Sequence, residues 1–362
     1  MPIQMKKFLQ TCTLVVLSGG VLTENLAQTN SPPKTYVSYQ SPIKPIIDGK
    51  LNDPVWDLAP WSDAFVDIQG DVMPKPTQLT RMKMLWDKDY FYIGVKLDES
   101  HLWATYTERE SIIFHENDIE VFLDPDGDTH NYYEWEINAL GTLWDLLLTK
   151  PYKDGGKPIN GWNINDFEYA VYLEGTLNDP SDTDEYWSVE MAIPWSSLTQ
   201  RSSPPSDGDQ WRINFSRVQW QLEVKDNLYT KVINPKTAKS FPEDNWVWSP
   251  IGLINMHIPD RWGYVQFSEA EVGTGTVPFV QHADENIKTS LRDLYHGQRA
   301  FYKEHSRYAV TVQEMNPEEV TVQAGIEVEF EVSRTRFKLS APSLDDPGKH
   351  WFITEDGRIW KQ

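Results

Sequence analysis

Two stretches in the middle of the chain alternate in side-chain character, and this alternation constrains the fold more than any other feature. In residues 117–123, one face of an extended chain carries Asp118, Glu120 and Phe122. In residues 132–138, one face carries Tyr132, Glu134, Glu136 and Asn138. The intervening positions are hydrophobic in both stretches. Because side chains of a strand point alternately to opposite faces, the pattern predicts two strands with one face in a core and one face rich in carboxylates.

The rest of residues 46–268 also has the residue pattern of short strands. Short apolar or alternating runs separated by turn residues occur at 82–86, 90–97, 142–148, 166–174, 186–193, 211–218, 228–233 and 263–267. Many short strands with turn signals between them favour a sandwich of two sheets over an α/β fold. The sequence therefore predicts a mainly β chain, in which residues 46–268 form a two-sheet antiparallel β-sandwich.

The residue pattern changes after residue 268. Residues 269–282 contain glycines and a proline and few bulky side chains, so we expect a linker there. In 285–306 the apolar residues recur at the spacing of an amphipathic helix. Short alternating runs follow to the end of the sequence. Residues 283–362 are therefore expected to form a small C-terminal α+β region.

The first residues indicate export. Lys6 and Lys7 precede an apolar run from Phe8 to about Leu22, and we expect a secretory signal peptide over 1–27, cleaved after Ala27. An uncleaved N-terminal anchor is the alternative. Residues 28–45, rich in Ser, Thr, Pro and Gln, are expected to be a leader or linker. No later stretch could span a bilayer, so we expect no integral membrane span in the mature chain.

Charge and cysteine content narrow the function. The net charge is −21, with 33 basic residues against 54 acidic ones, so nucleic-acid binding is not expected. The one cysteine, Cys12, lies in the expected signal peptide, so the mature chain has no disulfide and no thiol ligand or nucleophile. Exported proteins without disulfides favour a bacterial periplasm, cell surface or extracellular location.

An ordered set of short motifs resembles a known family. In sequence order they are Ile47-Asp48-Gly49-Lys50-Leu51-Asn52-Asp53-Pro54-Val55-Trp56, Leu85-Trp86-Asp87, Asn117-Asp118-Ile119-Glu120-Val121-Phe122-Leu123-Asp124-Pro125, Trp187-Ser188-Val189-Glu190-Met191-Ala192-Ile193-Pro194-Trp195, Trp211-Arg212-Ile213-Asn214-Phe215 and Trp262-Gly263. The set is similar to family 9 carbohydrate-binding modules over roughly residues 40–268. The resemblance implies an immunoglobulin- or DOMON-like β-sandwich with a glycan ligand.

The resemblance also implies site residues. Members of that family hold the end of a sugar chain between two tryptophans, and here Phe114 and Met256 fall at those positions. Glu120 matches a ligand-contacting carboxylate, whereas Glu136 falls where the family has an arginine. The carboxylate-rich face and two tryptophans complete the expected ligand-binding set: Asp118, Glu134, Asn138, Trp144 and Trp162.

The carboxylates leave alternatives open. The acidic face suits orientation of sugar hydroxyls, coordination of a cation, acid–base catalysis, or plain exposure to solvent. Asp124, Asp126 and Asp128 have the spacing of calcium ligands, but Thr129 follows them and breaks the EF-hand pattern. We expect no organic cofactor, and calcium at these three aspartates is a candidate metal site.

These observations converge on one expectation. The chain is predicted to be an exported protein that binds an oligo- or polysaccharide by aromatic stacking and by carboxylate and amide hydrogen bonds, in polysaccharide utilisation. Two alternatives stay open. One is a glycoside hydrolase that uses a carboxylate pair such as Glu120 and Glu136, and the other is a structural or partner-docking envelope protein that binds no glycan.

Overall fold

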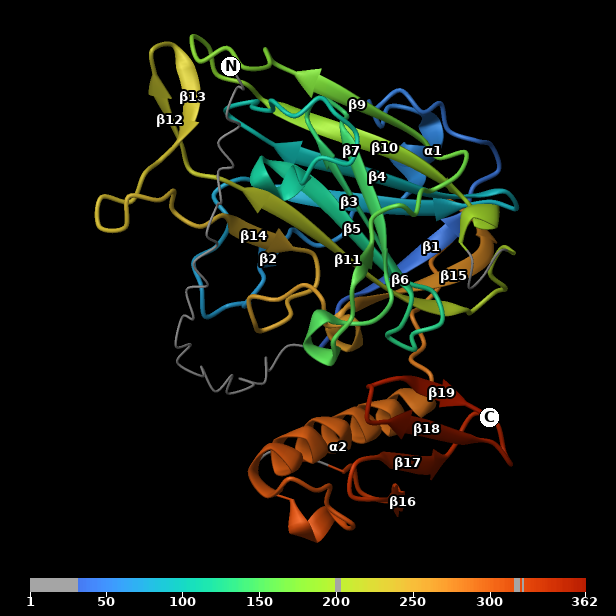
Figure 1. Cartoon of the computed structure of the whole chain (residues 1–362). Helices are drawn as coiled ribbons and strands as arrows, with labels where there is room; N and C mark the ends of the chain where they lie inside the picture. Colours follow the sequence, from blue (N-terminus) through green and yellow to red (C-terminus); the bar gives the residue numbers. More distant parts are fainter. Residues whose placement is uncertain (1–31, 199–202, 316–319, 321) are drawn as a thin grey trace, which may run out of the picture.

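The computed structural model describes residues 32–198, 203–315, 320 and 322–362. The expected signal peptide, residues 1–27, lies outside these ranges. The described chain forms a large β-sandwich followed by a smaller unit of one helix and four strands (Figure 1). No helix in this part of the chain is long and apolar enough to cross a membrane.

One layer of the sandwich carries the two alternating strands. Its strands, in hydrogen-bonded order, are β8 (Pro158–Ile159), β7 (Leu143–Leu148), β6 (Tyr132–Asn138), β5 (Asp118–Asp124), β11 (Gln210–Gln219) and β15 (Gly263–Glu271). The last part of β11 pairs instead with β14 (Asp244–Val247), which in turn pairs with β2 (Val66–Asp67). All these pairings are antiparallel.

The second layer packs face to face on the first. Its strands are β3 (Thr80–Trp86), β4 (Tyr90–Asp98), β10 (Tyr186–Pro194) and β9 (Glu168–Glu174). A single buried cluster joins alternate residues of both layers, including Ile119, Val121 and Leu123 of β5 with Ile93 and Val95 of β4. The hydrophobic positions of the alternating pattern thus face the core, and the predicted mainly β sandwich is confirmed.

Strand β1 (Thr35–Gln40) links the two layers and was not predicted. It runs parallel to β15 on one side and to β3 on the other, so the layers form one continuous hydrogen-bonded sheet that folds over on itself. Residues 35–40 were expected to belong to a leader, and this expectation is corrected. Side chains of β1 are buried at Tyr36, Ser38 and Tyr39, which ties the segment to the sandwich.

The C-terminal unit has its own hydrophobic core. Helix α2 (Asp284–His305) packs on a four-stranded antiparallel sheet of β16 (Glu329–Val332), β17 (Phe337–Pro342), β18 (His350–Thr354) and β19 (Ile359–Lys361). Buried helix residues such as Ile287, Leu291 and Leu294 meet Leu339 and Ile353 of the sheet. The predicted small α+β region is confirmed.

Short elements complete the described chain. A hairpin of β12 (Leu222–Lys225) and β13 (Leu228–Lys231) projects from the sandwich (Figure 1). The remaining helices are α1 (Pro54–Leu58) and the single 3₁₀ turns η1 (Ile113–His115), η2 (Tyr152–Asp154), η3 (Trp195–Ser197), η4 (Pro259–Arg261) and η5 (Val312–Glu314). Of these, η1, η2 and the segment before η4 border the cavity described next.

Candidate functional site

The outer face of β5, β6 and β7 places acidic and aromatic side chains side by side. Glu120 of β5 lies opposite Glu136 of β6, and Glu136 lies opposite Trp144 of β7. In the neighbouring row, Phe122 lies opposite Glu134. Directly opposed residues on one sheet face have their Cβ atoms about 5 Å apart, so these side chains form one continuous surface.

A cavity of about 380 Å³ lies over this surface. Six of the predicted ligand-binding residues line it: Phe114, Glu120, Glu134, Glu136, Trp144 and Met256. Polar groups that the sequence analysis did not predict also line it: Tyr152, Glu243, Asn245, Asn255 and His257. The cavity therefore combines apolar rings with hydrogen-bonding groups, which is the composition of a small-molecule site.

Two aromatic rings form one wall of the cavity. The ring centroids of Phe114 and Trp144 are 6.3 Å apart and their planes are inclined by 31°, and both side chains are half-buried. Phe114 lies in η1, where its backbone N–H donates to the Glu136 carboxylate at 3.0 Å. Its carbonyl oxygen accepts a 3.0 Å hydrogen bond from the indole of Trp220. These two bonds hold the backbone of Phe114 in place, although η1 is only a single turn.

The carboxyl groups of the floor are buried close to one another. Burial raises the pKa of Glu120 to about 8. Burial, together with the neighbouring Glu120 carboxylate, raises the pKa of Glu134 and of Glu136. No lysine or arginine is among the described residues that line the cavity. At neutral pH the floor must therefore be neutralised by protons, which make a carboxyl group a donor as well as an acceptor, or by a bound cation.

The opposite wall comes from two loops. The rings of Tyr152 and His257 are 4.5 Å apart, and Nδ1 of His257 shares a 2.9 Å hydrogen bond with the hydroxyl of Tyr132. Burial lowers the pKa of His257 to about 4, so its imidazole is neutral at physiological pH. A neutral imidazole offers one donor and one acceptor. Met256 beside it is buried.

Three of the predicted ligand-binding residues lie outside the cavity lining. Asn138 donates to the carbonyl oxygen of Tyr106 at 3.0 Å and accepts from the backbone of Thr142 at 2.9 Å, so its amide is engaged in a turn. Trp162 packs on Tyr133, with ring centroids 4.9 Å apart, against the main core. Asp118 is fully buried at the start of β5.

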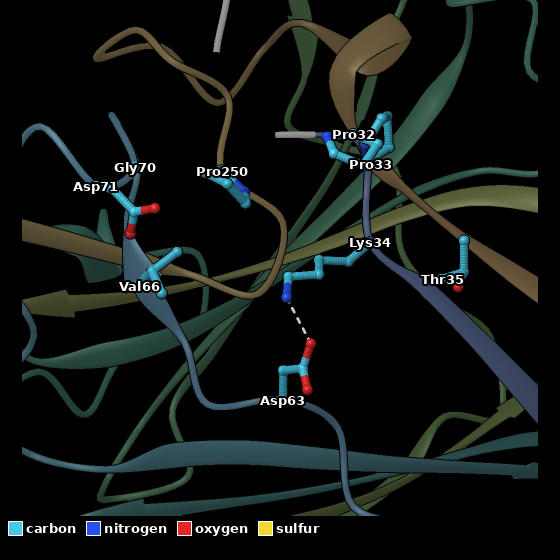
Figure 2. A pocket seen from close by; sticks show the side chains of 9 residues that line it. All are labelled: Pro32, Pro33, Lys34, Thr35, Asp63, Val66, Gly70, Asp71 and Pro250. Atoms are coloured by element: carbon cyan, nitrogen blue, oxygen red, sulfur yellow. Dashed lines mark hydrogen bonds and ion pairs between the residues drawn. The ribbon is translucent and has the colours of Figure 1, made fainter. Parts of the chain in front are cut away.

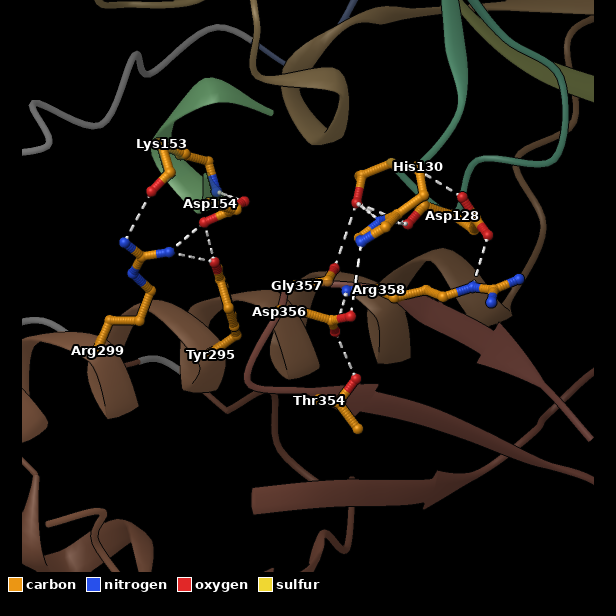
Figure 3. A network of polar contacts seen from close by, with 11 residues as sticks. Asp128, His130, Lys153, Asp154, Tyr295, Arg299, Thr354, Asp356, Gly357 and Arg358 are labelled. Carbon is orange, nitrogen blue, oxygen red and sulfur yellow. Dashed lines mark hydrogen bonds and ion pairs between the residues drawn. The ribbon is translucent and has the colours of Figure 1, made fainter. Parts of the chain in front are cut away.

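The Asp124–Asp128 turn lies against the C-terminal unit. One oxygen of each of Asp124, Asp126 and Asp128 falls within 4.8 Å of the others, so a cation site there stays a prediction. Asp128, however, already accepts a 2.9 Å hydrogen bond from Arg358, as Figure 3 shows. The carbonyl oxygen of Gly127 accepts from Arg292 of α2 at 3.2 Å. Two arginines of the C-terminal unit thus already donate hydrogen bonds to this acidic turn.

The C-terminal unit also holds the turn that carries Lys153 and Asp154, which follows Tyr152 in the cavity wall (Figure 3). Asp154, in the same turn as Tyr152, accepts hydrogen bonds from Tyr295 and Arg299 of α2. Arg299 donates in addition to the carbonyl oxygen of Lys153 at 2.9 Å. Sequence patterns could not reveal these contacts, because they join residues more than 140 positions apart.

A second cavity, of about 360 Å³, lies at the start of β1 (Figure 2). Its lining includes the ion pair between Lys34 and Asp63, both partly exposed, together with prolines, Val66 and Gly70. None of the described residues that line it is aromatic. It therefore lacks the flat apolar surface that recognises a sugar ring, and the cavity over β5, β6 and β7 is the better candidate site.

Comparisons with known proteins show what the sandwich is similar to. Residues 47–218 match the family model described as carbohydrate family 9 binding domain-like. Endo-1,4-beta-xylanase A of Thermoanaerobacterium saccharolyticum is 30% identical over 165 residues, which is 45% of this chain and 12% of the xylanase. Exoglucanase XynX of Acetivibrio thermocellus is 29% identical over 156 residues, 43% of this chain and 12% of the exoglucanase. The chain thus matches only a small part of each relative.

Among solved structures, a family 9 carbohydrate-binding module of Caldicellulosiruptor kristjanssonii, in complex with cellotriose, is similar to the sandwich. The two share 16% identity with a TM-score of 0.41, over 68% of this chain and 100% of that module. The resemblance inferred from the motifs is confirmed by the family match.

Proposed function

We propose that this chain is an exported carbohydrate-binding protein that takes part in polysaccharide utilisation, and that its glycan binds in the cavity over β5, β6 and β7. One observation carries the proposal. Two aromatic rings, Phe114 and Trp144, and four carboxyl groups converge on a single cavity of about 380 Å³. The family match of residues 47–218 supports the same class of ligand.

The geometry suits a sugar for physical reasons. The C–H face of a pyranose stacks on an aromatic ring, and Trp144 offers such a face at the cavity wall. The hydroxyls need directional partners, which Glu134, Glu136 and the amides of Asn245 and Asn255 supply. Raised carboxyl pKa values let the same groups donate as well as accept. The protein contributes affinity and no bond-making step.

The relatives guide the choice of the first probes. A xylanase and an exoglucanase carry the matching region, so xylo-oligosaccharides and cello-oligosaccharides are the first glycans to test. Binding of each to the full chain is measured by isothermal titration calorimetry. The variant Trp144→Ala removes the stacking ring, and Trp61→Ala is the matched control, because Trp61 is a tryptophan that is 40% exposed and lies outside the cavity lining.

We expect Trp144→Ala to weaken glycan binding at least tenfold, which corresponds to about 1.4 kcal/mol. Trp61→Ala should leave the affinity unchanged. Equal affinity in wild type and Trp144→Ala would place the glycan elsewhere. No binding by a folded sample to any glycan of an array would favour a structural or partner-docking role instead.

The same samples test the enzyme alternative. Released reducing ends are measured after long incubation with xylan and with a β-glucan. Turnover that is present in wild type and abolished in Glu120→Gln would contradict the binding-only proposal, because Glu120 and Glu136 would then act as a catalytic pair. We expect no turnover, and an effect of Glu120→Gln on affinity alone.

A further inference from the structure

Asp118 is a fully buried carboxylate. Its exposed fraction is 0%, and neither of its side-chain oxygens has a hydrogen-bond partner among the residues that the structure describes. A buried polar group left unsatisfied costs about 1–3 kcal/mol, and more if it is charged. Such a residue calls for a ligand or a proton that the protein itself does not provide.

Asp118 points into a cluster of acids. One oxygen from each of Asp118, Glu120 and Glu136 lies within 4.8 Å of the other two. The three residues come from neighbouring positions of β5 and β6, where Glu120 is directly opposite Glu136. Because these strands are held in register by the sheet, the three carboxyl groups cannot move far apart to relieve their repulsion.

The spacing fits a hard divalent cation. Calcium binds oxygen ligands at about 2.3–2.6 Å, so two oxygens on opposite sides of one ion are about 5 Å apart. Oxygens that all lie within 4.8 Å of one another can therefore share a single calcium ion. Magnesium demands shorter and more regular bonds and keeps its water, so the less strict calcium ion suits this cluster better.

The position of the cluster links it to the ligand. Glu120 and Glu136 line the cavity, and Asp118 is buried beside the lining, two residues before Glu120 on β5. Calcium takes about six to eight oxygens, more than three carboxylates usually supply. The remaining positions would open toward the cavity, where hydroxyl oxygens of a bound sugar could occupy them.

Charge decides what kind of sugar fits. Three ionised carboxylates exceed the charge of one calcium ion by one, and Glu134 and Glu243 also line the cavity. An acidic sugar would meet net negative charge even with the ion in place. A neutral sugar is therefore the favoured ligand.

We propose that Asp118, Glu120 and Glu136 form a calcium site at the floor of the cavity, and that the bound ion coordinates hydroxyl groups of a neutral glycan. The metal site stands on its own residues, whereas the second half of the proposal rests on the proposed carbohydrate-binding function. The experiment therefore measures the two halves separately.

The first measurement uses calcium alone. The full chain is stripped with a chelator, and calcium chloride is titrated into it by calorimetry. We expect wild type to bind calcium, and Asp118→Asn, which keeps the shape but removes the charge, to lose at least tenfold in affinity. Asp124, Asp126 and Asp128 form a second acidic cluster that could bind calcium, so the comparison is made in an Asp126→Asn background. Asp126→Asn alone is the matched control, and it should keep the calcium binding that is lost when Asp118→Asn is added.

Thermal unfolding gives a second readout. Calcium should raise the Tm of Asp126→Asn, but not that of the variant that carries both Asp126→Asn and Asp118→Asn, because a ligand stabilises the state that binds it. If Asp118→Asn fails to fold, Glu136→Gln takes its place in both measurements. No calcium binding by wild type at millimolar concentration would overturn the metal site, and so would unchanged binding in the folded variant.

The second measurement adds the best-binding neutral oligosaccharide with and without calcium. We expect the affinity for the glycan to fall at least tenfold in the chelated protein. Equal affinity in both conditions would overturn the coordination of sugar by the ion, while the carbohydrate-binding function would stand. Calcium binding without any glycan binding would uphold the metal site and refute the function.

Discussion

Arg299 of α2 fixes the turn that carries Tyr152, so its removal should loosen one wall of the cavity. Arg299 donates to the carboxylate of Asp154 and, at 2.9 Å, to the carbonyl oxygen of Lys153. Asp154 itself is nearly fully buried, with 2% of its side chain exposed. The variant Arg299→Ala deletes both bonds and leaves Tyr295 as the remaining donor to Asp154 from α2.

The expected cost follows from this geometry. A hydrogen bond with a charged partner contributes about 1.5–3 kcal/mol when it is shielded from water. The Arg299 side chain is 41% exposed, so solvent screening reduces this contribution. We therefore expect a loss of about 1.5 kcal/mol for the two bonds together. This equals about a tenfold increase in the population of molecules in which the turn is open.

Hydrogen exchange measures this population directly. The turn is closed by backbone hydrogen bonds from Asp154 and Gly156 to Pro151 and from Gly155 to Tyr152. The protection of these three amides should fall about tenfold in Arg299→Ala, because exchange through local opening follows the open fraction. The affinity for a glycan should change much less, since the open state remains a minority.

The matched control is Arg307→Ala. Arg307 pairs with Glu314 at 2.8 Å within the C-terminal unit, and its hydrogen bonds among the described residues go to Glu314 and Tyr308, not to the Tyr152 turn. Its removal should leave the protection of the turn unchanged. The reasoning would be refuted if Arg299→Ala left the three amides as protected as in wild type, or if Arg307→Ala exposed them equally.

Two further predictions concern stability. Arg217→Met should lower the free energy of unfolding, measured with urea, by about 3–5 kcal/mol, because it leaves the buried Glu99 carboxylate, which lies 3.0 Å from Arg217, without its cation. Adding Glu99→Gln should recover part of this loss. A double variant that is no more stable than Arg217→Met would contradict this reasoning. For Asp284, burial opposes ionisation, but hydrogen bonds such as the one from Ser343 at 2.7 Å lower the pKa to about 2. An aspartate in the unfolded chain has a pKa of about 3.9. The contribution of Asp284 to the free energy of unfolding is therefore fully present above that pH and is lost as the pH falls toward 2. Urea midpoints measured from pH 5 to pH 2.5 should therefore fall more steeply in wild type than in Asp284→Asn, and parallel curves would refute the assignment.

The sequence revealed the acidic face because strand alternation is a local property. The pattern at Glu120 and at Glu134 and Glu136 needs only neighbouring residues to be recognised, and the structure places these side chains together at one cavity. Phe114 and Met256 were assigned from the family resemblance, and both line the same cavity. The local pattern and the order of the motifs together were sufficient to predict residues of one wall and of the floor of the cavity.

Tyr152 and His257 were missed for a physical reason. They lie in loops whose positions depend on partners distant in sequence, such as Tyr132 for His257 and α2 for the Tyr152 turn. Trp162 shows the converse case. Its loop-like surroundings in the sequence suggested a residue that stacks on a sugar, whereas the structure packs its ring on Tyr133, outside the cavity lining. No local sequence pattern distinguishes a loop residue that lines the cavity from one that packs on the core.

Strand β1 was missed because its composition is that of a linker. The Ser, Pro and Gln residues around it carry no alternation strong enough to indicate a strand. It is ordered by backbone pairing to β15 and β3 on both sides, with buried Tyr36 and Tyr39 as its anchors. Parallel pairing between distant segments leaves little trace in the sequence itself.

The most direct test of the central claim is a crystal structure of the chain with its tightest-binding oligosaccharide. The account predicts a sugar ring stacked on Trp144, with hydroxyl oxygens within hydrogen-bond distance of Glu134 or Glu136. A glycan bound at another surface, with the cavity over β5, β6 and β7 free of sugar, would contradict the proposed site.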